Sequence, residues 1–225
     1  PERFTDYGPN GLQVEGKASI RKIVSGVTAS RALIEAAIAE KADAIFVHHG
    51  LFWRGQTGVV TGWMRERLRL LLAHDINLYS YHLPLDAHPT LGNNSQLGQQ
   101  LGLIGPDASA SGNITHFGEQ QLGWMANIEP NSNEALKQPE TLHKHLEFIL
   151  NRPVSSVFNV DAAIKKIAWC SGGAQSYFEA AINAGADAFI TGEISEPQAH
   201  LARECGVAYF ACGHHATERY GAPAV

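Results

Sequence analysis

Two stretches of this chain resemble each other at a fixed distance, and this repeat limits the folds that the chain can adopt. Residues 20–49 align without a gap with residues 164–193, and ten of the thirty aligned pairs are identical. Among the identical pairs are Glu35 with Glu179 and Asp43 with Asp187. Chance would give roughly two identities, so we predict an internal duplication.

Each copy has the pattern of a strand, a helix and a second strand. In the first copy, Ser30 is a suitable N-cap, and the apolar run from Ala44 to Val47 indicates a buried strand. A helix and a third strand are expected after each copy, at 64–74 and 76–81 in the first half and at 196–204 and 207–212 in the second. We therefore predict an α/β fold of two related β-α-β-α-β halves, with helices flanking mostly parallel sheets.

We place the first α/β half at residues 1–103 and the second at 104–225. The second half contains residues 105–161, whose composition differs and which we interpret as a connecting insertion. The start at Pro1 instead of Met and the abrupt end at Val225 predict that residues are missing at both termini.

Composition favours a soluble globular protein. Hydrophobic residues make up 44% and charged residues 17% of the chain, and the net charge of −5 gives no support to a general nucleic-acid surface. The cysteines Cys170, Cys205 and Cys212 form no Cys-x-x-Cys pair, which indicates reduced thiols and a cytoplasmic protein. Apolar runs stay well below the ~18 residues of a membrane span, so we expect no membrane partner.

Polar residues with metal-binding side chains follow several of the predicted strands. His48 and His49 end the second strand of the first half, and His49 aligns with Glu193 of the second half. Ligands collect at the carboxyl ends of parallel strands. The candidate residues at these strand ends are His48, His49, His82, Asp86, Glu193, His214, His215 and Glu218.

Imidazole and carboxylate donors together suit Zn, Mn, Fe or Co better than Ca or Mg. If a helix starts near residue 216, His214 and Glu218 share one face of it at i and i+4. His48 and His49 point to opposite faces of a regular strand, so they serve one locus only where the strand gives way to a loop, or else hold two separate metals. Two metals are the more economical interpretation, with Asp86 well placed to bridge ions ~3.5–4 Å apart.

Five ordered motifs then resemble one known family. They are Gly-Pro-Asn-Gly-Leu-Gln at 8–13, Val-His-His-Gly at 47–50, His-Leu-Pro-Leu-Asp at 82–86, Thr-Gly-Glu at 191–193 and Gly-His-His-Ala-Thr-Glu at 213–218. Together they resemble the NGG-interacting-factor-three-like family, whose members are often labelled GTP cyclohydrolase 1 type 2 homologues. The resemblance implies a toroidal homohexamer with a dinuclear centre, whose two divalent metal ions per subunit are held by His48, His49, Asp86, His214 and Glu218.

The function expected from these observations is metal-dependent hydrolysis of a small nucleotide-like or phosphorylated substrate. Glu193 and His82 are the candidates for catalytic proton transfer, and His215 is the candidate for an outer-shell partner. A non-catalytic metal-binding or regulatory protein is the alternative. A third hypothesis is a nuclease-like role in DNA repair, for which the sequence offers no basic patch.

Overall fold

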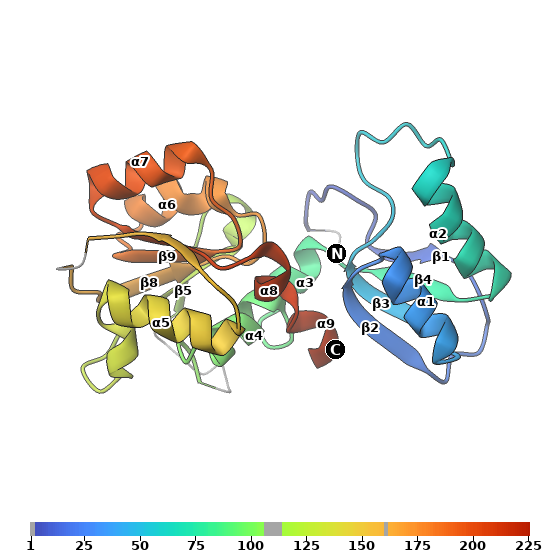
Figure 1. The fold of residues 1–225 in the computed structure, drawn as a ribbon, viewed down its shortest axis with the longest axis horizontal. Helices are drawn as coiled ribbons and strands as arrows, with labels where there is room; N and C mark the ends of the chain where they lie inside the picture. Colours follow the sequence, from blue (N-terminus) through green and yellow to red (C-terminus); the bar gives the residue numbers. More distant parts are fainter. Residues whose placement is uncertain (1–2, 106–113, 160–161) are drawn as a thin grey trace. The chain divides into compact units, whose positions relative to one another are not determined.

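A computed structural model describes residues 3–105, 114–159 and 162–225. It divides into two compact units (Figure 1). The first unit ends at Leu85 and also includes Ala222–Val225, and the second unit is Asp86–Gly221. The chain passes from the first unit to the second within the short helix α3 (Leu83–Asp86).

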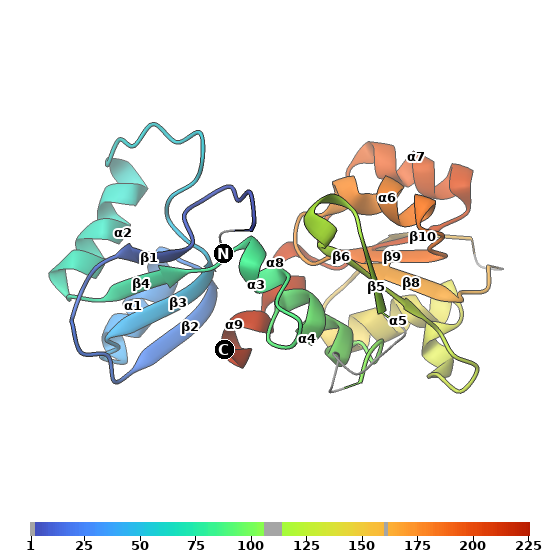
Figure 2. The same ribbon diagram turned by 180° about the vertical axis from the view of Figure 1, so that it is seen from behind.

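The first unit is built on a four-stranded sheet with the order β1-β4-β3-β2. Its strands are β1 (Gly11–Val14), β2 (Ile23–Thr28), β3 (Ala44–His49) and β4 (Asn77–Ser80). Strands β2, β3 and β4 are parallel, and β1 is antiparallel to β4. The helices α1 (Arg31–Ala39) and α2 (Gly62–Ala73) lie next to each other over one face of this sheet (Figures 1 and 2).

Local chemistry explains where these elements begin and how they pack. The side chain of Ser30 accepts a hydrogen bond from the backbone N–H of Leu33, which caps α1 as predicted. The apolar side of α1 places Ile34 against the buried strand residues Ile45 and Val47. The core of the first unit is therefore a single layer between the sheet and its two helices.

The second unit is built on a six-stranded sheet with the order β5-β6-β8-β9-β10-β7. Its strands are β5 (Ile114–Phe117), β6 (Gly123–Asn127), β7 (Ser155–Val157), β8 (Lys166–Trp169), β9 (Ala188–Thr191) and β10 (Ala208–Ala211). Its helices include α4 (Asn93–Gln100), α5 (Pro139–Leu150), α6 (Phe178–Asn183), α7 (Glu196–Cys205) and α8 (His214–Glu218), and α9 (Gly221–Ala224) follows them. Short 3₁₀ helices lie at Glu119–Gln121, Glu134–Leu136 and Gln175–Tyr177.

Helices cover both faces of this second sheet (Figures 1 and 2). On one face, Leu97 of α4 and Leu142 of α5 pack into a core with Ile190. On the other face, Phe178 of α6 stacks on Phe189 at 5.6 Å between ring centroids. Neighbouring residues of a strand point to opposite faces, so Phe189 and Ile190 of β9 serve the two cores separately.

The predicted mixed α/β architecture with helix-flanked sheets is confirmed. The second sheet differs from the prediction of mostly parallel strands: β8, β9 and β10 are parallel, but β6 is antiparallel to β8, β5 to β6 and β7 to β10, because strands from the stretch before the second repeat join this sheet. In the described part of residues 105–161, β6 pairs with β8 and β7 pairs with β10 in the second sheet. Leu97 and Leu101 pack into the core of the second unit. The two sequence halves at 1–103 and 104–225 stay a prediction.

The two predicted repeats make equivalent contacts. Ile23 pairs with Ala44 in the first sheet, and Ile167 pairs with Ala188 in the second, which keeps the offset of 144. The carboxylate of Asp43 accepts hydrogen bonds from the backbone N–H groups of residues 21 and 22, and that of Asp187 accepts them from residues 165 and 166. Each aspartate therefore holds the backbone at the start of a strand, β2 for Asp43 and β8 for Asp187. Common origin of the halves stays a prediction.

Within the described residues, the helices are all too short or too polar to cross a membrane.

Candidate metal centre

Three histidines of the first unit lie together beyond the carboxyl ends of β3 and β4. One ring nitrogen each of His48, His49 and His82 lies within 4.8 Å of the others. The ring centroids of His48 and His49 are only 4.5 Å apart, although the two residues are adjacent in sequence. Because His49 is the last residue of β3, the regular alternation of side chains ends there, and both imidazoles reach the same region.

Hydrogen bonds to the ring nitrogens define how these histidines are oriented. His48 is fully buried, and its Nδ1 lies 3.0 Å from the carbonyl oxygen of Tyr81. A carbonyl can only accept, so Nδ1 donates and Nε2 carries the lone pair that a metal needs. The Nδ1 of His49 lies 3.1 Å from the hydroxyl of Thr28.

His82 has a carboxylate partner that the sequence analysis did not identify. Its Nδ1 lies 2.6 Å from Oδ1 of Asp6, whose side chain is only 5% exposed. Asp6 belongs to the turn-rich stretch directly before the Gly-Pro-Asn-Gly-Leu-Gln motif. The motif marks this segment in the sequence, but it does not indicate that Asp6 contacts a histidine 76 positions away.

The second unit contributes a group of its own around α8. Nε2 of His214 lies 3.3 Å from Oε2 of Glu218, which confirms the predicted shared face at i and i+4. Glu218 is 3% exposed and Asp86 is 8% exposed. Asp86 Oδ1 accepts hydrogen bonds from the side chains of Asn93 at 2.9 Å and Ser171 at 3.2 Å. Buried carboxylates of this kind are costly without a compensating positive charge, which a metal cation would supply.

Glu193 acts on His214 from the opposite side of the imidazole ring. Its Oε1 lies 2.6 Å from Nδ1 of His214, so the ring is held between Glu193 and Glu218. Hydrogen bonding to Glu218 and its negative charge, with a smaller contribution from Glu193, outweigh burial and raise the pKa of His214 to about 9. A carboxylate is one of the outer partners that commonly bind the second ring nitrogen of a metal-binding histidine.

A glycine brings the backbone close to the two ligand candidates of α8. Gly172 has a φ of +70°, and a Cβ atom at this position would collide with Oε1 of Glu218. Its N–H donates to Thr217 Oγ1 at 2.9 Å, which ties this backbone to α8. The close approach therefore requires glycine.

His215 and Cys212, which the sequence places near the ligand candidates, differ in their exposure to solvent. The side chain of His215 is exposed. Cys212 is buried, and burial raises the pKa of its thiol to about 12, so it stays protonated and unreactive at neutral pH.

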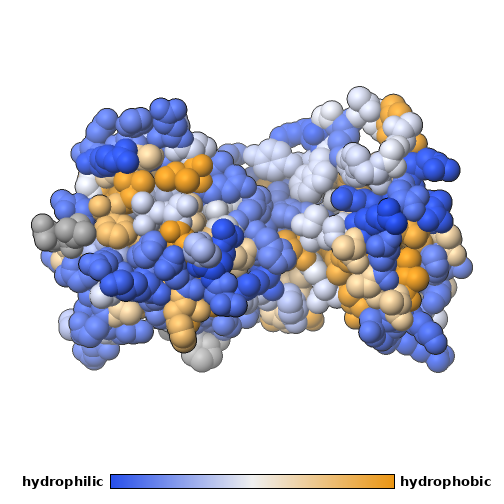
Figure 3. Space-filling view, viewed as in Figure 1, coloured by the Kyte–Doolittle hydropathy of each residue, from blue (hydrophilic) through white to orange (hydrophobic). Residues whose placement is uncertain are grey.

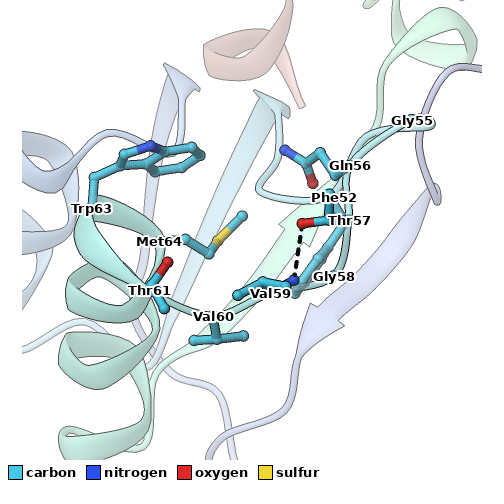
Figure 4. A pocket seen from close by; sticks show the side chains of 10 residues that line it. All are labelled: Phe52, Gly55, Gln56, Thr57, Gly58, Val59, Val60, Thr61, Trp63 and Met64. Atoms are coloured by element: carbon cyan, nitrogen blue, oxygen red, sulfur yellow. Dashed lines mark hydrogen bonds between the residues drawn. The ribbon is translucent and has the colours of Figure 1, made fainter.

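A separate hollow in the first unit lies beside the start of α2 (Figure 4). It has a volume of about 270 Å³ and is lined by Phe52, Gly55–Thr61, Trp63 and Met64. A hydrogen bond from the N–H of Val59 to Thr57 Oγ1 shapes its loop. Its lining contains no histidine or carboxylate, so the hollow is distinct from the metal-ligand candidates.

The fold and these side chains define a mixed α/β protein that carries histidine, aspartate and glutamate groups able to bind a metal ion. The family described as Duf34/NIF3 (NGG1p interacting factor 3) matches residues 1–225, and the chain belongs to this family.

Named relatives are similar to the chain over nearly its whole length. The chain is 51% identical over 222 residues to a "GTP cyclohydrolase 1 type 2 homolog" of Neisseria meningitidis serogroup B, which covers 99% of the chain and 84% of that relative. It is 47% identical over 220 residues to the protein of the same name from Escherichia coli strain K12, covering 97% of the chain and 83% of the relative. The solved structure of protein ybgI, described as of unknown function, matches with a TM-score of 0.86 at 45% identity, covering 99% of this chain and 85% of the other.

Proposed function

We propose that the protein is a dinuclear metal-dependent hydrolase that acts on a small nucleotide-like or phosphorylated substrate. In this proposal His48, His49, Asp86, His214 and Glu218 hold two divalent ions, with Zn, Mn, Fe and Co as the candidate metals. The observation that carries the proposal is the cluster of His48, His49 and His82 at the ends of two parallel strands. The name of the relatives makes GTP the first substrate to test.

The charge of the proposed ligands supports this substrate class. Two divalent ions bring four positive charges, of which Asp86 and Glu218 neutralise two. The remaining charge would attract phosphate oxygens even though the whole chain carries a net charge of −5. Bound divalent metals supply Lewis-acid activation of water and of the substrate.

Side chains beside the ligands supply the remaining chemistry. We assign proton transfer to His82 and Glu193, the two candidates from the sequence. The contact of Glu193 with His214 also supports a positioning role, because the carboxylate holds the Nδ1 proton and turns Nε2 toward Glu218. The contact of His82 with Asp6 at 2.6 Å fixes the imidazole in the same manner.

We further propose that the protein is cytoplasmic and forms a homohexameric ring. Large hydrophobic side chains on the first unit support assembly: Val59 is 64% exposed, and Ile23, Trp63 and Leu72 are each 60% exposed. Figure 3 shows hydrophobic surface on this unit, including the crest of the loop between β3 and α2. Sedimentation velocity of the purified protein tests the hexamer, and a monomer at micromolar concentration would contradict it.

Metal analysis and a substrate screen test the proposed function. We expect about two ions per chain and turnover of GTP or of another member of a nucleotide and phosphoester panel. Variants His49→Ala and Asp86→Ala should lose at least about tenfold in rate. His200→Ala is the matched control, because its side chain is 62% exposed and pairs only with Glu196 of its own helix among the described contacts.

Two outcomes would contradict the hydrolase proposal. Bound metal with no turnover of any substrate would instead support the non-catalytic metal-binding protein. Unchanged rates in His49→Ala and Asp86→Ala would separate any activity from these ligands.

A further inference from the structure

The carboxylate of Asp6 is surrounded by hydrogen-bonding groups from two separate segments of the chain. Its Oδ1 accepts from Tyr7 N and lies 2.6 Å from Nδ1 of His82, and its Oδ2 accepts from Asn10 Nδ2 at 2.8 Å and from Leu83 N at 3.0 Å. The backbone and amide groups in this set can only donate. The carboxylate therefore has four donor positions around it when Nδ1 of His82 also carries a proton.

This arrangement fixes the tautomer of His82. Because the other donors already hold Asp6 as an acceptor, the Nδ1 atom of His82 has to be the proton-bearing nitrogen. Nε2 then carries the lone pair. His82 lies with its ring centroid 4.9 Å from that of His48 and 5.6 Å from that of His49.

Further contacts hold the ring in this position. The backbone N–H of His82 donates to Oδ1 of Asn10 at 2.8 Å, so the same short segment ties both the main chain and the side chain. The indole ring of Trp53 meets the imidazole edge-on at 5.0 Å between centroids. The imidazole is therefore oriented by the folded protein before any ligand arrives.

We propose that His82 is a further imidazole ligand of the metal centre and that Asp6 is the positioning residue that holds it ready. The inference rests on the proposed metal centre and adds one ligand and one outer partner to it. It replaces the proton-transfer role of His82, because Nδ1 is held by Asp6 and Nε2 would be bound to the metal. Carboxylate–imidazole pairs of this geometry fix ring orientation and raise the basicity of the coordinating nitrogen. The pair formed by Glu193 and His214, also at 2.6 Å, is the counterpart in the second unit.

The first experiment uses the unmodified, metal-free protein. Nitrogen-15 NMR of labelled histidine reports which ring nitrogen of His82 is protonated. We expect the Nδ1–H form. An Nε2–H form in the wild-type protein would overturn the inference without the need for any variant.

The second experiment measures zinc affinity by competition with a chromophoric chelator. Asp6→Asn should weaken binding by about 10–100-fold, as loss of an outer carboxylate partner typically does. Asp43→Asn is the matched control, because Asp43 also accepts two backbone hydrogen bonds and a side-chain one but precedes β3, at the other end of the strand from the histidines. Wild-type affinity in Asp6→Asn, or equal losses in both variants, would overturn the positioning role.

A third variant separates ligation from proton transfer. His82→Gln should lower zinc affinity to a similar extent if His82 is a ligand, whereas unchanged affinity with lost turnover would overturn ligation. Failure of the hydrolase proposal gives a different result, since absence of turnover leaves the tautomer and the affinity measurable. A wild-type protein that binds no zinc would overturn both.

Discussion

Replacing Gly172 by alanine tests whether Glu218 is held by close contact with the backbone. The substitution has two separable effects. A φ of +70° costs an L-residue about 1–2 kcal/mol of folding free energy, and the new Cβ would also collide with Oε1 of Glu218 and lie 3.2 Å from Nε2 of His214. The backbone cannot easily retreat, because Gly172 is hydrogen-bonded through both its N–H and its carbonyl oxygen.

Gly206 provides the matched control for this strain. It has a φ of +67° at the C-terminal end of α7, and a Cβ there would meet nothing within 4 Å. We expect Gly172→Ala and Gly206→Ala each to lose about 1–2 kcal/mol or more in urea unfolding. Only Gly172→Ala should also lose metal affinity, by at least about tenfold, which corresponds to about 1.4 kcal/mol in a calorimetric titration.

Two results would contradict the proposed contact between Gly172 and Glu218. Wild-type metal affinity in Gly172→Ala would show that Glu218 does not need its present position to bind metal. An equal loss of affinity in Gly206→Ala would show that general destabilisation, and not contact with Glu218, weakens binding.

Three further predictions concern charge and packing. The pKa of His214 is raised to about 9, so its protonation stabilises the metal-free protein fully below pH 6.5 and is lost as the pH rises through 9. The melting temperature should therefore fall over this range, and His214→Gln should remove that dependence. An unchanged slope in the variant would contradict this. Asp187→Ala should lower the free energy of unfolding by about 1–2 kcal/mol, because two backbone N–H groups lose their acceptor, while Glu204→Ala on the exposed side of α7 should not. Phe189→Ala should cost about 3–5 kcal/mol in the same urea assay, since its ring is fully buried, and a loss below about 1 kcal/mol would contradict this packing.

Much of the architecture could be predicted from local patterns. The buried run before His48, the cap at Ser30 and the spacing of His214 and Glu218 each depend on residues close together in the chain. Such patterns predict strands, helix starts and shared helix faces directly. They were sufficient for the mixed α/β class and for the ligand candidates at the strand ends.

The pairing of distant segments could not be predicted in this way. Strands β6 and β7 join the second sheet beside β8 and β10, and the local pattern of residues 105–161 does not indicate these partners. The helices cover one face of the first sheet and both faces of the second, although the two repeats read alike (Figures 1 and 2). The order of strands in a sheet depends on which apolar faces are buried, and this burial is determined only when the whole unit packs.

The sequence by itself therefore determined the order of the elements and the chemical types at the strand ends. Only the tertiary structure decided which carboxylate serves which histidine. Asp6 reaches His82 across 76 positions, and Glu193 reaches His214 across 21. A hydrogen bond depends on distance and direction in space, and chain separation along the sequence carries neither.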